Sequence, residues 1–231
     1  MWPGATFVCI ATGPSLTQEQ VDKVLAWRVR TGIKVIAIND AYLYAPWADA
    51  LYFADARWWQ WQDEGIARPA LGLSAREVQA RFRAFRGMRI SIENNKKRAI
   101  PDPSVIVLRD LSLDGGTMGR LSTDPTGLYT GNNSGYQAIG CAVLLGAQRI
   151  VLLGYDMKSK DKQHHCWGNH PVNSDDQTYR QWRFEYGRIA ETAARMGLEI
   201  VNATADSNLE HFPMVTIESL VADTQRACVP T

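Results

Sequence analysis

Short apolar segments that end in glycine or polar residues recur along this chain, and they constrain its fold more than any other feature. The first is 6–11 (TFVCIA), which runs into Gly-Pro, and the second is 34–38 (KVIAI), which runs into Asn-Asp. Apolar runs of this length are typical of strands buried on both faces of a parallel sheet. We expect further strands over 50–53, 88–92, 104–108, 149–153 and 199–202.

Helical patterns lie between these strands. Thr17 and Gln20 have the spacing of a capping box, an apolar stripe follows them, and Gly32 fits the end of that helix. Further helices are expected over 74–85, from Asn133 onward, and over 177–196. Strands that alternate with helices predict a Rossmann-like α/β fold, with a mostly parallel sheet flanked by helices.

The length of 231 residues suits one α/β domain, so we interpret 1–231 as a single domain. The region 57–130 fits the pattern least well. It begins with Trp58, Trp59 and Trp61 and ends in a stretch rich in Gly, Ser, Thr and Asp over 110–129. Long loops are usually functional or mobile, so this region is interpreted as an inserted lid. The tryptophans belong either to that lid, to the core or to a contact within a homo-oligomer.

Composition excludes several classes of protein. The net charge of +1 gives no field that favours nucleic acid or an anionic membrane. No basic leader with a long apolar region begins the chain, and no apolar run is long enough for a bilayer, so a cytoplasmic protein is expected. The cysteines form no CxxC pair, which argues against a zinc ribbon or a disulfide framework.

Two segments have the features of an anion site. Thr12 and the turn Gly13-Pro14-Ser15 follow the first strand, where glycine permits close approach of the backbone to a phosphate. Ser134 and Gly135 open a later helix, where the serine either caps the helix or binds a ligand. Neither segment is GxGxxG or a P-loop. The sequence therefore predicts a nucleotide or nucleotide-sugar site, and ordinary βα turns are the alternative.

Polar residues also end the next two strands. Asn39 and Asp40 follow the second strand, and Asp55 follows the third. The carboxyl ends of parallel strands border one crevice, so these side chains are placed to bind ribose or sugar hydroxyls. The alternative is that they are turn residues.

Three histidines follow the segment that contains Tyr155 and Asp156, namely His164, His165 and His170. Imidazole is suited to proton transfer near pH 7, so one of them is a candidate general base. A metal site built from His165 and His170 with Asp156 or Cys166 is a second hypothesis, although the spacing matches no common zinc motif. An ordinary loop is the third. His211, near the end of the chain, is expected to be structural.

These segments together resemble a known family. The residues concerned are Ala11–Leu16, Ile38–Asp40, Ser134-Gly135, Ile150–Asp156 and Trp167–His170. They are similar to the CMP-sialic acid-dependent sialyltransferases of glycosyltransferase family 42, and equally to the related DUF115-like Rossmann proteins of unassigned function, some of them carried by bacteriophages. The Gly-Pro-Ser-Leu opening is shared with archaeal pterin diphosphokinase-like proteins.

The resemblance implies roles for individual residues. Gly13, Pro14, Ser15 and Asn39 would contact the phosphate of a nucleotide-sugar, and Ser134 and Gly135 would complete the donor site. His170 would be the general base that deprotonates the hydroxyl of a glycan or another acceptor. Asp156 would shape the nucleotide pocket. The family needs no metal cofactor, so none is expected, and a cytoplasmic location in a bacterium or a phage-infected host fits the relatives.

The chain departs from the sialyltransferases at some of these positions. Thr12 stands where they have asparagine, and Asp40 where they have glutamine. Lys158 is the first position that matches their leaving-group tyrosines, and a lysine there would neutralise a departing phosphate by its charge. A glycosyltransferase is the leading hypothesis. The alternatives are a diphosphokinase that uses ATP and Mg²⁺ held by Asp40, Asp55 and Asp156, and a non-catalytic nucleotide-binding phage accessory protein.

Overall fold

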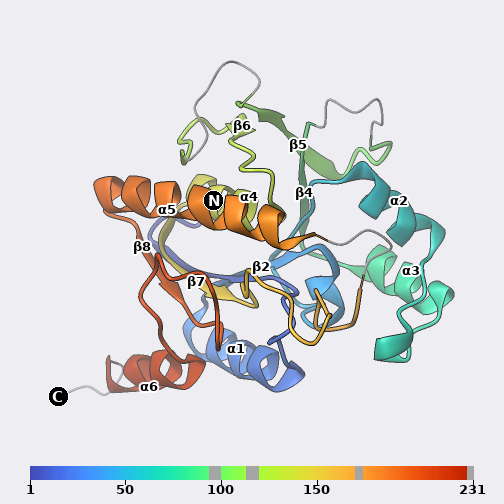
Figure 1. Cartoon of the computed structure of the whole chain (residues 1–231), viewed down its shortest axis with the longest axis horizontal. Helices are drawn as coiled ribbons and strands as arrows, with labels where there is room; N and C mark the ends of the chain where they lie inside the picture. Colours follow the sequence, from blue (N-terminus) through green and yellow to red (C-terminus); the bar gives the residue numbers. More distant parts are fainter. Residues whose placement is uncertain (94–99, 113–119, 170–173, 228–231) are drawn as a thin grey trace.

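A single sheet of parallel strands forms the centre of the molecule (Figure 1). The computed structural model describes residues 1–93, 100–112, 120–169 and 174–227. Within them eight strands pair in the order β6-β5-β4-β3-β2-β1-β7-β8. The strands are β1 (Ala5–Ile10), β2 (Lys34–Ile38), β3 (Ala50–Tyr52), β4 (Met88–Ile92), β5 (Val105–Asp110), β6 (Gly127–Leu128), β7 (Ala147–Leu153) and β8 (Glu199–Asn202). The predicted Rossmann-like α/β fold is confirmed.

Helices cover both faces of this sheet. On one face lie α1 (Gln18–Thr31) and α6 (Ile217–Ala227), and on the other lie α4 (Ser134–Leu144) and α5 (Asp176–Met196), as Figure 1 shows. Beyond β3 the chain forms α2 (Ala56–Glu64) and α3 (Ala75–Ala84), which pack against each other. Two short 3₁₀ helices, η1 (Asn39–Leu43) and η2 (Pro69–Leu71), connect these elements.

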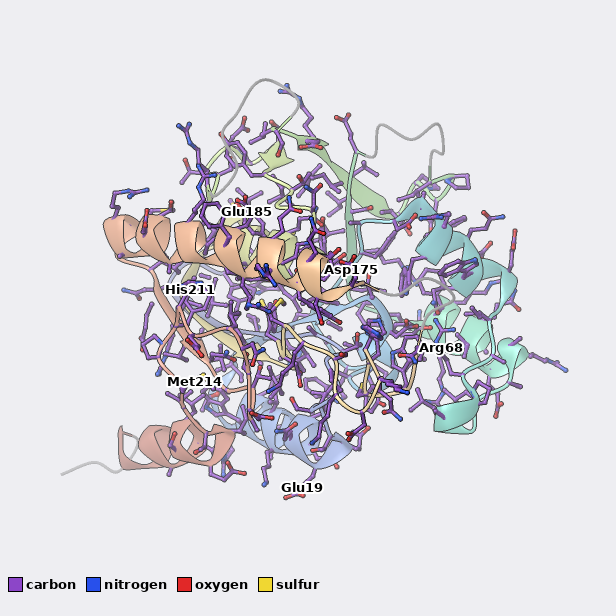
Figure 2. All side chains as sticks on the ribbon, viewed as in Figure 1. Glu19, Arg68, Asp175, Glu185, His211 and Met214 are labelled. Atoms are coloured by element: carbon purple, nitrogen blue, oxygen red, sulfur yellow. The ribbon has the colours of Figure 1, made fainter. Side chains whose placement is uncertain are left out.

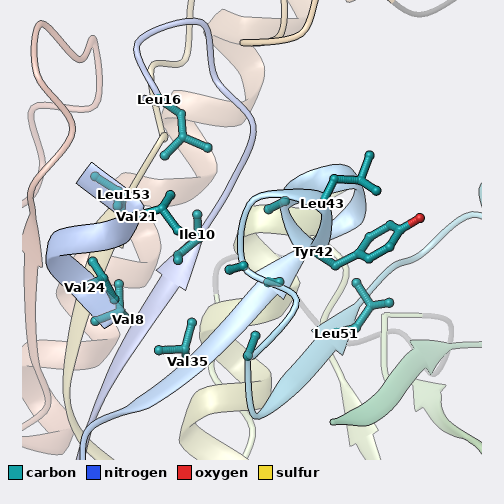
Figure 3. Close-up of a cluster of buried hydrophobic side chains, with 14 of the residues drawn as sticks. Val8, Ile10, Leu16, Val21, Val24, Val35, Tyr42, Leu43, Leu51 and Leu153 are labelled. Carbon is teal, nitrogen blue, oxygen red and sulfur yellow. The ribbon is translucent and has the colours of Figure 1, made fainter. Parts of the chain in front are cut away.

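The core on the α1 face shows why the apolar runs become central strands. Val8 and Ile10 of β1 contact the buried face of α1, where Val21 and Val24 have no exposed surface (Figure 3). The alternate β1 residues Phe7 and Cys9 enter the second core under α4 and α5. Burying one such side chain contributes about 1.5–3 kcal/mol. The strand is therefore stabilised from both sides, as its sequence predicts.

Local signals in the sequence mark where helices begin and end, as expected. The Thr17 hydroxyl accepts the Gln20 N–H, and the Gln20 side chain accepts the Thr17 N–H, which completes the predicted capping box at α1. Gly32 ends the same helix in the left-handed region with φ of 75°. Gly197 does the same for α5 with φ of 66°. Glycine adopts this conformation without the steric cost that a Cβ adds.

The region 57–130 differs from the prediction of an inserted lid. Its described residues supply β4, β5 and β6 to the same sheet, so this part continues the parallel order beyond β3. Trp58 is buried, contacts Phe53 with ring centroids 5.0 Å apart, and belongs to the core. Residues 113–119, the middle of the expected lid, lie outside the described residues.

The last helix of the described chain has no counterpart in the sequence-based prediction. The C-terminal helix α6 packs beside α1, where Lys23 bridges Glu19 and Glu218. Cys9 and Cys141 are buried free thiols, and burial raises the pKa of Cys9 to about 12. In the described ranges, no helix combines the length and the hydropathy needed to span a membrane.

Candidate functional site

A cavity of about 270 Å³ opens at the carboxyl ends of β1, β2 and β7. It lies where the sheet order changes direction, because β1 pairs with β2 on one side and with β7 on the other. Open parallel sheets bind ligands at such a point. Its walls are the segments after these strands, the start of α4, the loop with His164 and His165, and the first turns of α5.

Most of the predicted site residues meet at this cavity. Those that line it are Thr12, Gly13, Pro14, Asn39, Ser134, Gly135, Asp156, Lys158 and His165. Ser15, Asp40 and Asp55 are not among the lining residues. His170, the base that the resemblance implies, lies outside the described residues. The strand ends singled out from the sequence therefore border one cavity, although the side chains of Ser15, Asp40 and Asp55 do not line it.

The Gly13-Pro14-Ser15 turn already holds a carboxylate of the protein. The Ser15 N–H donates to Asp156 Oδ1 at 2.9 Å, and the Ser15 hydroxyl donates to Oδ2 at 3.0 Å. A Cβ on Gly13 would lie 1.9 Å from Asp156 Oδ2, so only glycine allows this approach. The helix α1 begins later, at Gln18, and its cap is closed by Thr17. The expected role of this turn is corrected accordingly, because its Ser15 donors bind Asp156.

Asp156 is an almost fully buried carboxyl group at the floor of the cavity, with 3% of its surface exposed. Burial raises its pKa above the ordinary value of 3.8, and the two hydrogen bonds from Ser15 oppose that shift. The carboxylate therefore orders the segment after β7 and also places a buried negative charge beside any ligand.

The start of α4 has the features of an anion-binding element. Asn133 is the N-cap, since its side chain accepts the Tyr136 N–H at 3.0 Å and the Tyr186 hydroxyl at 2.8 Å. The alternative that Ser134 caps the helix is therefore wrong. Ser134 and Gly135 line the cavity, and within the described chain the Ser134 hydroxyl has no hydrogen-bond partner. The first N–H groups of a helix have no intrahelical acceptor and favour anions.

Asp40 is turned into the protein. Its carboxylate accepts from Arg68 at 2.9 Å, Gln62 at 3.2 Å and Trp58 at 3.3 Å, and both partners of the ion pair are buried. Asp55 is the N-cap of α2, where it accepts the Arg57 N–H. Neither carboxylate reaches the cavity, because each is used to stabilise the polypeptide that follows its strand. The structure therefore places both outside the lining of the candidate site, which differs from their predicted contact with sugar hydroxyls.

A stack of flat side chains connects that buried ion pair to the cavity. The Arg68 Cζ lies 4.5 Å from the centroid of the Trp167 ring, and the His165 ring lies parallel to the same indole at 5.0 Å. His165 Nδ1 shares a hydrogen bond with the Thr12 hydroxyl at 2.9 Å. Figure 2 labels Arg68 near α3 and Asp175 at the start of α5. His165 is thus held in place at the cavity wall.

Tyr179 and Trp182 of α5 line the cavity but were not singled out from the sequence, whereas His164 was one of the three candidate histidines. His164 Nδ1 shares a hydrogen bond with the Tyr179 hydroxyl at 3.0 Å, and burial raises the pKa of Tyr179 to about 12. Trp182 lies one turn later on α5 and also lines the cavity. Their spacing at the start of a predicted amphipathic helix was the available signal, but it is equally typical of core residues.

Lys158 contributes positive charge at the rim. Its ammonium group lies 2.9 Å from Asp206 Oδ2, and its side chain is partly exposed while that of Asp206 is largely exposed. His211 does not line the cavity; its ring faces Gly187 below α5 (Figure 2). Its expected structural role agrees with this position.

Three of the six described non-glycine residues with positive φ lie at the cavity. Asn39, Asn132 and Met157 have φ between 50° and 52°, and all three line it. A left-handed backbone is costly for residues with a Cβ and persists where the surroundings impose it, often at ligand sites. This supports a functional interpretation of the cavity.

The described ranges contain no group of three or more His, Cys, Asp or Glu side chains that could hold a metal ion. Asp40, Asp55 and Asp156, the ligands expected for a diphosphokinase, are in separate environments.

No family model, curated protein or solved structure matches this chain. The resemblance of its segments to sialyltransferase-like proteins therefore remains a sequence-based expectation.

Proposed function

We propose that the cavity binds a nucleotide-sugar and that the protein is a glycosyltransferase acting on a hydroxyl acceptor. The observation that carries this proposal is the start of α4, which presents Ser134 and Gly135 to a cavity also lined by Lys158. A helix N-terminus, an unengaged hydroxyl and an ammonium group together favour a phosphate. The phosphate would lie at α4 and not at the Gly13 turn, because Asp156 engages that turn.

The proposed reaction transfers a glycosyl group. A general base removes the proton of the acceptor hydroxyl, the oxygen attacks the anomeric carbon, and the bond from that carbon to the phosphate oxygen breaks. The electron pair of that bond leaves on the phosphate. Ser134, the first N–H groups of α4 and Lys158 would stabilise the developing charge, which is the type of interaction that lowers the barrier most.

The general base proposed here is His170, on the resemblance alone. The described wall of the cavity already carries His164 and His165, so imidazoles border the space in which an acceptor would lie. Replacing His170 with Ala should decrease turnover of a nucleotide-sugar and leave its binding unchanged. Unchanged turnover would remove His170 as the base.

The first test is a thermal-shift screen with CMP, CDP, UDP, GDP and ATP, each with and without Mg²⁺. A ligand that binds only the folded state raises the melting temperature by mass action. We expect a shift with a pyrimidine nucleotide without metal. A shift only with ATP and Mg²⁺ would favour the diphosphokinase, and no shift with any nucleotide would contradict the proposal and leave a non-catalytic role.

A pair of lysine variants tests the position of the phosphate. Lys158 lines the cavity, whereas Lys160 is exposed in the same loop and does not. Lys158→Ala should weaken nucleotide binding by about tenfold, since a charge-assisted contact contributes about 1.5–3 kcal/mol when buried and less at a rim. Lys160→Ala should leave affinity unchanged. Equal affinities for both variants would contradict the proposed position.

A further inference from the structure

The first turns of α5 carry an aromatic corner that no proposed step has yet used. Tyr179 and Trp182 both line the cavity, with ring centroids 5.6 Å apart and planes at 87°. Two rings that meet at a right angle present a flat face beside an edge, which suits a planar guest.

Contacts on three sides hold α5 against the cavity. The Tyr186 hydroxyl donates to Asn133 at the start of α4, Arg183 donates to the Met157 carbonyl at 2.9 Å, and Tyr179 bonds to His164. Each of these side chains stabilises a different segment of the wall. The helix is therefore a fixed platform, so the position of its remaining lining residue is defined before a ligand binds.

That remaining residue is Trp182. It is half-buried, lines the cavity, and its indole N–H makes no hydrogen bond with the described part of the chain. Its neighbours Tyr179, Arg183 and Tyr186 are engaged with the wall, whereas Trp182 contacts the Tyr179 ring and the core beneath it. The large aromatic surface of Trp182 therefore lines the cavity while its indole N–H makes no hydrogen bond within the described chain.

The spacing along α5 relates this surface to the proposed phosphate position. Trp182 precedes Tyr186 by one helical turn, about 6 Å, and Tyr186 is bonded to the residue directly before Ser134. Trp182 and Ser134 line the same cavity, so a base against Trp182 and a phosphate at the start of α4 can belong to one ligand.

We propose that Trp182 is the stacking surface for the nucleobase, so that the base lies against α5 and the phosphate at the start of α4. This rests on the proposed function and names the part of the ligand that supplies affinity and selectivity. Stacking is open to every base, because each has a π face. The amides of Asn39 and Asn132 at the cavity wall would then distinguish one base from another.

The test compares two probes on the full chain by isothermal titration calorimetry. The first is a set of nucleoside monophosphates (CMP, UMP, AMP and GMP), and the second is ribose 5-phosphate, which has the same sugar and phosphate but no base. For the wild type, we expect at least one nucleoside monophosphate to bind more tightly than ribose 5-phosphate. Trp182→Ala should weaken that nucleotide by about tenfold or more and leave ribose 5-phosphate unchanged.

Two further variants separate stacking from folding. Trp182→Phe keeps an aromatic face and should restore most of the affinity. Phe184→Ala removes an aromatic side chain from the same helix that is 65% exposed and does not line the cavity, so it should have no effect.

Equal nucleotide affinity of Trp182→Ala and the wild type would overturn this inference and leave the proposed function standing. A Trp182→Ala variant that loses both probes equally would overturn it too, because the indole would then contact the sugar. Failure of every probe to bind the wild type would overturn the proposed function as well.

Discussion

The buried ion pair between Asp40 and Arg68 gives the sharpest test of how this fold is stabilised. Their oxygen and nitrogen atoms are 2.9 Å apart, and the side chains are only 1% and 3% exposed. At an effective dielectric constant near 20, two charges at that distance attract by about 6 kcal/mol. The cost of removing both charges from water offsets much of this, so the net contribution of the pair is far smaller.

Breaking the pair from one side is a different perturbation. Arg68→Met keeps the length of the stem and removes the guanidinium, while the neutral donors of Gln62 and Trp58 still reach the buried carboxylate. We expect the free energy of unfolding to fall by about 3–5 kcal/mol. Asp40→Asn should also destabilise the protein, since it leaves the guanidinium buried. The double variant should cost at least about 2 kcal/mol less than the sum of the two single changes.

Urea unfolding followed by circular dichroism measures these differences, with the m-value checked for constancy. The matched control is the pair Arg57–Asp55, whose side chains are 57% and 44% exposed. Arg57→Met leaves the Asp55 cap in place and should cost less than about 1 kcal/mol. A loss below 1 kcal/mol for Arg68→Met, or strict additivity in the double variant, would refute the electrostatic reasoning.

Three further predictions concern the cavity wall. Gly13→Ala should lower the free energy of unfolding by about 1–3 kcal/mol in urea, because its Cβ would overlap Asp156 Oδ2; a change within 0.5 kcal/mol, roughly that of an ordinary surface substitution, would contradict this. Asp156→Asn removes a carboxyl group whose pKa is raised by burial, so the wild-type group stabilises the fold below pH 3.8 and loses that contribution as the pH rises through its native pKa. The stability of the variant relative to wild type should therefore increase over that pH range, and a pH-independent difference would show that burial does not control the pKa of Asp156. Asn133→Ala removes the cap of α4 and an acceptor for Tyr186, so the melting temperature should fall, by an amount equivalent to about 1–3 kcal/mol, and a wild-type melting temperature would contradict its capping role.

The elements that sequence analysis predicts well are those specified by neighbouring residues. The run TFVCIA becomes β1, and Thr17, Gln20 and Gly32 determine the ends of α1 through contacts inside one or two turns. The helix α6 was missed although Thr216 accepts the Ser219 N–H as a cap would. Tertiary packing is the main source of helix stability in proteins, and the packing of α6 beside α1 joins residues far apart in the chain.

The fate of the polar strand ends was harder to predict. Asn39 and Asp40 are adjacent, yet one lines the cavity and the other enters a buried ion pair. The difference comes from the turn η1, in which Asn39 adopts φ of 50° and successive side chains diverge. The partner Arg68 belongs to a segment of irregular structure beyond α2, and no periodic pattern in the sequence indicates that it would return to the end of β2.

The register of one strand pair explains why the anion site that we propose differs from the one expected from the sequence. Ile10 of β1 lies level with Leu153 of β7, so Gly13 and Asp156 both lie three residues beyond a matched pair. The Asp156 carboxylate at that point accepts hydrogen bonds from the Ser15 N–H and hydroxyl, so these two donors are already engaged by the protein. Glycine at position 13 is then needed for the protein's own carboxylate as well as for close approach to a phosphate, and both explanations fit the same motif. At the start of α4 the cap is instead an uncharged asparagine, which engages Tyr136 and Tyr186. The proposed position of an anionic ligand therefore depends on a pairing between distant strands, which a motif along the chain does not contain.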